Sequence, residues 1–84
     1  MQKFLLVRDD SLADIDEGLP SCKNLININL IHHVFMSCPD EIAIHIEYFN
    51  TKANKVCRCI ENFDTERECH IRFHEIAKIL IGEA

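Results

Sequence analysis

The sequence EIAIHIEYFNTKANKVCRCIENF, residues 41–63, decides the fold because it contains two strand-like segments and a polar connection between them. In residues 41–49 every second side chain is large and apolar: Ile42, Ile44, Ile46 and Tyr48. A period of two is typical of a β-strand with one face buried. Residues 55–63 form a second apolar segment, and Asn50 and Asn54 in the connection tolerate left-handed backbone. The stretch predicts an antiparallel hairpin with a loop of about five residues.

After this hairpin the spacing of the apolar residues changes to that of a helix. One helical stripe collects Cys69, Phe73, Ile76, Ala77 and Leu80. Thr65 and Glu68 have the spacing of a capping box, in which each side chain satisfies a backbone donor of the other residue. Gly82 follows as a C-terminal stop. The pattern predicts a helix over residues 65–81.

The N-terminal half of the chain adds extended segments. Residues 3–8, KFLLVR, predict a short strand, and residues 9–21 predict an acidic loop. Residues 24–38 contain two extended apolar runs, which fit either one bent strand or two strands. The segments together predict a single α+β domain over residues 1–84. Its architecture is a small antiparallel sheet of about four strands, with the C-terminal amphipathic helix packed on one face.

Length and composition exclude several classes of protein. The chain has 84 residues, of which 48% are hydrophobic and 27% charged, and this balance is that of a folded domain. No apolar run approaches the roughly 18 residues that a membrane-spanning helix needs. The first residues, MQKFLLVRDD, lack the apolar core and cleavage site of a signal peptide. We therefore expect a cytoplasmic protein with no membrane partner.

The charge balance argues against binding to nucleic acid. The net charge is −5, with nine basic and fourteen acidic residues, and the basic residues are scattered along the chain. Binding to phosphates normally requires a basic stripe. The acidic residues gather near the N-terminus as Asp9, Asp10, Asp14, Asp16 and Glu17. This segment is either a solvated loop or a docking surface for a basic partner, and it lacks the later ligands of a calcium-binding loop.

Thiols and imidazoles are the remaining chemical candidates. Five cysteines are an odd number, and without a secretion signal this predicts reduced thiols. Cys57 and Cys59 share one strand face, Cys69 lies on the buried helical stripe, and His70 and His74 are four residues apart on the helix. These five residues are candidate zinc ligands. One alternative is that the cysteines are small buried hydrophobic residues and the histidines an exposed pair. Another is that Cys57 and Cys59 form a redox pair, although they lack the helix N-terminus that lowers the thiol pKa in C-x-x-C enzymes.

No catalytic motif is present, so we do not expect an enzyme. The sequence has neither a nucleophile elbow nor a glycine-rich phosphate loop, and it contains only two glycines. Both faces of the predicted strands carry apolar side chains, which favours a non-catalytic protein-interaction or regulatory module that self-associates as a homodimer. The alternatives are a metal- or thiol-sensing protein that uses the five candidate ligands, and an inhibitor that presents its acidic surface to a nucleic-acid-binding enzyme.

Overall fold

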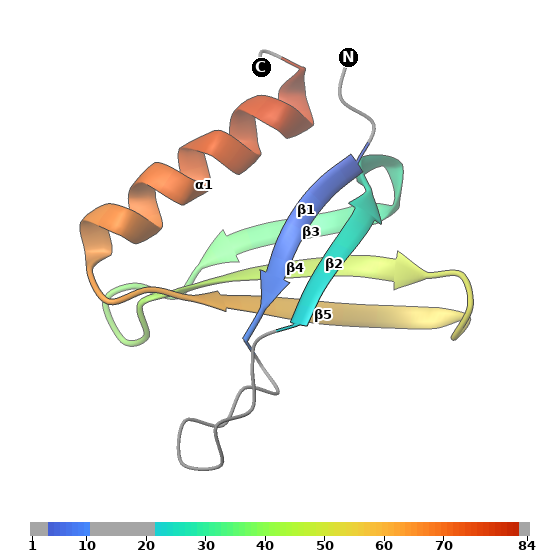
Figure 1. Cartoon of the computed structure of the whole chain (residues 1–84), viewed down its shortest axis with the longest axis horizontal. Coiled ribbons are helices and arrows are strands. Elements are labelled where there is room, and N and C mark those ends of the chain that lie inside the picture. The colour runs from blue at the N-terminus through green and yellow to red at the C-terminus, as the bar shows by residue number, and fades with distance from the viewer. Residues whose placement is uncertain (1–3, 11–21, 83–84) are drawn as a thin grey trace.

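The computed structural model describes residues 4–10 and 22–82, which form five strands and one α-helix in the order β1 (Phe4–Asp9), β2 (Cys22–Asn27), the 3-10 turn η1 (Ile28–Leu30), β3 (Ile31–Met36), β4 (Ala43–Asn50), β5 (Lys55–Asn62) and α1 (Glu66–Ile81). All paired strands are antiparallel (Figure 1). This confirms the α+β class. Within the described residues, no helix has both the length and the apolar character needed to cross a membrane.

The strands form two small sheets where the sequence predicted one. β1 pairs with β2 in the first sheet, and the second sheet has the order β3-β4-β5. The division falls at η1, where the Asn27 side chain accepts a hydrogen bond from the backbone N–H of Asn29 at 2.9 Å. This short-range bond caps the turn and redirects the chain. Residues 24–38 therefore supply two strands, and these belong to different sheets.

The predicted hairpin and helix are both confirmed. β4 and β5 pair in continuous register from Ala43–Asn62 to Asn50–Lys55, and Asn54 in the connection has a positive φ of 53°. Thr65 Oγ1 accepts a hydrogen bond from the Glu68 backbone N–H at 3.2 Å, so the N-cap forms as its spacing indicates. At the other end Gly82 adopts the left-handed conformation, with φ of 80°.

The core lies between the two sheets and the helix. Its buried residues are Leu5 and Val7 of β1, Ile26 of β2, Ile44 and Ile46 of β4, Cys59 of β5, and Cys69 and Ile76 of α1. The β1–β2 pair crosses the β3-β4-β5 sheet, and α1 lies beside the β1–β2 pair (Figure 1). Ile44 and Ile46 are fully buried on the inner face of the larger sheet. The alternation in residues 41–49 therefore faces the core as expected.

One buried carboxylate joins the two sheets to the helix. Glu61 of β5 is only 2% exposed. It accepts hydrogen bonds from the Arg8 backbone N–H at 3.0 Å and from Arg72 of α1, through Nε at 2.8 Å and Nη2 at 3.0 Å. Arg72 Nη2 also donates to the backbone carbonyl of Leu6 at 2.8 Å. β1, β5 and α1 therefore meet at this carboxylate.

We predict that Glu61→Gln lowers the free energy of unfolding by about 2–4 kcal/mol, because the largely buried Arg72 guanidinium loses the charge that compensates it. Urea unfolding monitored by circular dichroism measures the loss. The matched control is Glu47→Gln, which removes a more exposed carboxylate 3.6 Å from Arg58 and should cost less than about 1 kcal/mol. Equal losses for the two variants would contradict the role assigned to Glu61.

Candidate functional site

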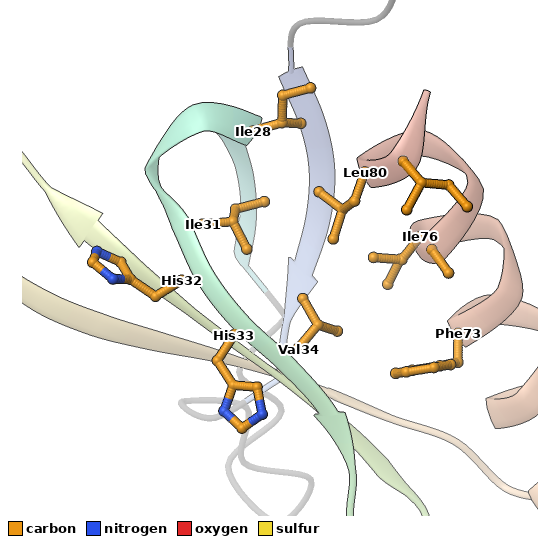
Figure 2. A pocket seen from close by; sticks show the side chains of 10 residues that line it. Ile28, Ile31, His32, His33, Val34, Phe73, Ile76 and Leu80 are labelled. Carbon is orange, nitrogen blue, oxygen red and sulfur yellow. The ribbon is translucent and has the colours of Figure 1, made fainter. Parts of the chain in front are cut away.

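An apolar groove of about 400 Å³ opens between β3 and α1. Figure 2 shows its two walls, with Ile28, Ile31 and Val34 on one side and Phe73, Ile76 and Leu80 on the other. The rings of His32 and His33 border the groove but point away from the helix (Figure 2). Among the described residues no Asp, Glu, Lys, Arg, Ser or Cys lines the groove, and the titratable side chains at its border are those of His32 and His33.

The helical wall comes from the stripe that the sequence indicated. Ile76 is fully buried in the core, whereas Phe73 and Leu80, three residues before it and four after, are only half-buried. Ile81 at the helix end is 67% exposed although it lines the same groove. The stripe is therefore wider than the core that it covers, and its remainder forms an open apolar surface.

β3 is one of the two edge strands of the larger sheet, and among the described residues its only strand partner is β4. Proteins protect such edges with charged residues, prolines or bulges. Ile31–Met36 contains no Lys, Arg, Asp, Glu or Pro. A register irregularity lies between Ile31 and His33, but His33–Met36 pairs regularly with Glu47–Ile44. Within residues 4–10 and 22–82, most of β3 therefore presents an unprotected edge beside the groove.

The outer face of the larger sheet carries a packed aromatic cluster. The Phe35 and His45 rings are stacked, with centroids 4.8 Å apart and planes within 3°. The Arg58 guanidinium lies 5.7 Å from the centre of the Phe35 ring. His45 is 7% exposed, its Nε2 lies 3.3 Å from Ser37 Oγ, and its Nδ1 has no hydrogen-bond partner in the described part of the chain. Ring stacking and the Ser37 contact fix this histidine in place.

The five predicted zinc ligands do not converge. Cys57 and Cys59 lie on β5, Cys69 is buried on α1, and His70 and His74 are exposed on the same helix. Within residues 4–10 and 22–82, no group of three or more His, Cys, Asp or Glu side chains is arranged to bind a metal ion. Cys59 Sγ instead accepts a hydrogen bond from Asn24 Nδ2 at 3.5 Å. Burial, followed by the charge of Asp9, raises the pKa of the Cys59 thiol.

A different pair of thiols is in contact. Cys38, in the loop between β3 and β4, makes a thiol–thiol contact with Cys69, and the two Sγ atoms are 3.8 Å apart. Burial first and Cys38 second raise the pKa of Cys69 to about 11. Sequence spacing gave no signal for this pair, because the two residues are 31 positions apart. Only the packing of α1 against the β3–β4 loop brings them together.

Two of the acidic candidates are engaged in the fold. Asp10 Oδ2 accepts hydrogen bonds from the Asn62 backbone N–H and from Arg8 Nε, both at 2.8 Å. Asp9 Oδ1 accepts from the Ile60 backbone N–H at 3.3 Å, and the Asp10 N–H donates to the Ile60 carbonyl at 2.7 Å. These bonds attach the end of β1 to β5. The other acidic candidates, Asp14, Asp16 and Glu17, lie outside the described residues.

Comparison of the chain with protein-family models, curated proteins and solved structures gives no match. A fold alone does not determine function, which depends on the chemistry of particular sites. Two features of the described residues offer such chemistry: the β3 edge with its groove, and the Cys38–Cys69 pair.

The buried thiol of Cys69 predicts a loss of stability at alkaline pH. Its pKa is about 11 in the folded chain against an ordinary value of 9.0. Below the ordinary value both states keep the proton and the stability contribution is complete. Above it only the unfolded chain ionises, so the free energy of unfolding falls by about 1.4 kcal/mol per pH unit until the folded thiol also ionises.

Urea unfolding between about pH 8 and about pH 10.5 measures this slope, because the window begins near the ordinary thiol pKa and ends near that of the folded chain. Burial also raises the pKa values of Cys59 and Tyr48, and these groups add to the slope in the same direction. The variant Cys69→Ala removes the contribution of this thiol, so its free energy of unfolding should fall less steeply with pH than that of the wild type. Identical slopes would contradict the buried, protonated state of Cys69.

Proposed function

We propose that this chain is a non-catalytic protein-interaction or regulatory module that self-associates, and that two copies meet through β3 and the groove beside it. The observation that carries this proposal is the coincidence of an unprotected sheet edge with an open apolar groove. The predominance of apolar side chains in the described groove lining supports a role in binding. A second copy is the occupant that fits both features.

The free edge of β3 supports pairing with the same strand of a second chain. Two identical strands can pair antiparallel about a two-fold axis, which makes the interface self-complementary. The regular segment His33–Met36 is available for this pairing on the side opposite β4. The larger sheet would then continue from one copy into the other, and the unpaired backbone groups of both edges would be satisfied.

The groove would be filled by the side chains that the added strand brings with it. Val34 and Ile31 point from β3 toward α1 (Figure 2). In a strand added beside β3, the equivalent side chains of the second copy fall under the same helix, because alternate residues keep to one face of a sheet. Phe73, Leu80 and Ile81 would cover them. Burial of this apolar surface supplies the driving force, at roughly 25 cal/mol per Å² removed from water.

The distribution of charge is compatible with this contact. Each chain carries a net charge of −5, so two copies repel one another at long range. Among the described residues, none with a formal charge lines the groove or lies within β3. Approach through this surface therefore brings together mainly apolar side chains of the described part of the chain.

We predict that Ile81→Lys raises the dissociation constant of the homodimer by about 10–100-fold, because it places a charge at the groove in place of an apolar side chain. Analytical ultracentrifugation over a concentration series measures the effect. Ile71→Lys is the matched control, since Ile71 is also exposed on α1, at 52%, but does not line the groove. The proposal fails if the wild type stays monomeric at about 100 μM, a concentration well above a micromolar Kd, or if both variants weaken association equally.

The dependence of self-association on salt concentration distinguishes this proposal from binding through the acidic residues. Raising the ionic strength from about 0.05 M to about 0.5 M screens the repulsion between two copies, and should strengthen self-association. A contact between the acidic segment and a basic partner would instead weaken with salt. The sedimentation series repeated at the two salt concentrations provides the comparison, and a dimer that dissociates as salt rises would contradict an apolar interface.

A further inference from the structure

We infer that Cys38 and Cys69 form a reversible dithiol–disulfide site, and that its oxidising substrate is a small-molecule disulfide of the glutathione type. This inference is independent of self-association, because it concerns two residues within one chain and neither lines the groove. It also differs from the predicted metal site, since it pairs Cys69 with a cysteine that was not among the candidate ligands.

The two sulfurs are already in contact. Their separation of 3.8 Å has to shorten to about 2.05 Å for a covalent bond, which is a movement of less than 2 Å shared between two side chains. The loop that carries Cys38 is anchored on both sides of the cysteine. The Ser37 N–H donates to the Ala43 carbonyl at 3.1 Å, and the Glu41 N–H donates to the Ser37 carbonyl at 3.3 Å. The fold therefore holds Cys38 against α1.

Competing partners among the described cysteine side chains are less well placed. Cys57 and Cys59 are alternate residues of β5, and the rise of a strand separates such residues by roughly 6.5 Å. Cys59 is buried between Asn24 and Tyr48, both of which contact its thiol. Among the four described cysteine side chains, those of Cys38 and Cys69 are in contact.

Accessibility sets the order of the chemical steps. Cys38 is half-buried, whereas Cys69 has no exposed surface, so the small disulfide meets Cys38 first. The Cys38 thiolate attacks one sulfur of the small disulfide, the S–S bond of that molecule breaks, and its leaving thiolate takes a proton from water. Cys69 then loses its proton and attacks the Cys38 sulfur, and the second small thiol is released.

The balance of this reaction is complete. Two protein thiols and one small disulfide give one Cys38–Cys69 disulfide and two small thiols. The cysteines lose two electrons, and the small disulfide gains them. The second step is the slow one at neutral pH, because burial raises the pKa of Cys69 to about 11 and leaves little thiolate. Closure should accelerate as the pH rises toward that value.

The disulfide would tie the N-terminal part of α1 to the β3–β4 loop. It closes a chain segment between residues 31 positions apart, which restricts the unfolded chain far more than the folded one. The midpoint of thermal unfolding should rise by roughly 10–20 °C on oxidation. By the same linkage, folding must favour the disulfide, so the folded chain should oxidise at a lower ratio of oxidised to reduced glutathione than the chain in guanidinium.

The experiment equilibrates the purified chain with glutathione mixtures of stepped ratio, quenches it with acid, and maps disulfides by mass spectrometry without reduction. Cleavage after Lys and Arg places every cysteine of the chain on a separate peptide, since Lys23, Lys52, Arg58 and Arg67 divide them. The expected product is a link between the Cys38 and Cys69 peptides with no glutathione retained. The wild type should also lose two thiols per chain.

Three variants make the assignment specific. Cys38→Ser should abolish closure, and Cys57→Ser is the matched control that should oxidise as the wild type does. Cys69→Ala should stop at a mixed disulfide of glutathione with Cys38, and circular dichroism checks that this core variant folds. The inference is overturned if the link maps to another pair, if Cys38→Ser still loses two thiols, or if oxidation is equally favourable in the folded chain and in guanidinium.

Discussion

The buried Glu61 carboxylate is the interaction on which the arrangement of the fold depends. Removing a carboxylate from water is unfavourable unless several donors replace the lost hydration. Here the donors come from β1 and α1, through the Arg8 backbone N–H and the Arg72 guanidinium. The helix is therefore anchored beside β1 and β5, and β5 is the edge strand of the larger sheet opposite to β3. Its later residues extend along β3 without filling the space next to that strand, and this space is the groove.

Local signals predicted the elements, whereas the contact between elements required the structure. The alternation of Ile44 and Ile46, the Thr65 cap and Gly82 act within a few residues, so spacing alone indicates the hairpin and the helix. The division into two sheets depends on contacts between distant residues. Glu61 resembles any polar strand position in the sequence, and nothing near it indicates that Arg72 and β1 surround its carboxylate.

The candidate site residues show the same contrast between features that local spacing predicts and contacts that only the tertiary structure determines. Spacing correctly placed Cys69 in the interior, because the residue belongs to an apolar helical stripe. It suggested Cys57 and Cys59 as companions since they are neighbours on one strand, but the sulfur in contact with Cys69 is that of Cys38. The acidic segment shows the same limit, because Asp10 looked like a surface charge and instead bonds to the backbone of β5. The type of a residue indicates which contacts it can make, whereas tertiary packing determines which residue it contacts.

Within the described residues, the edge of β3 is less protected against strand pairing than the edges of β5 and β2. The edge of β5 is engaged at Ile60 by the backbone of Asp10 and the side chain of Asp9, so the end of β1 covers it. β2 carries the exposed Lys23, a residue that discourages edge pairing. Within the described residues, β3 has neither a covering segment nor a Lys, Arg, Asp or Glu. Because an unprotected edge in a folded chain invites strand addition, the edge left open is the one where a second copy is expected to bind.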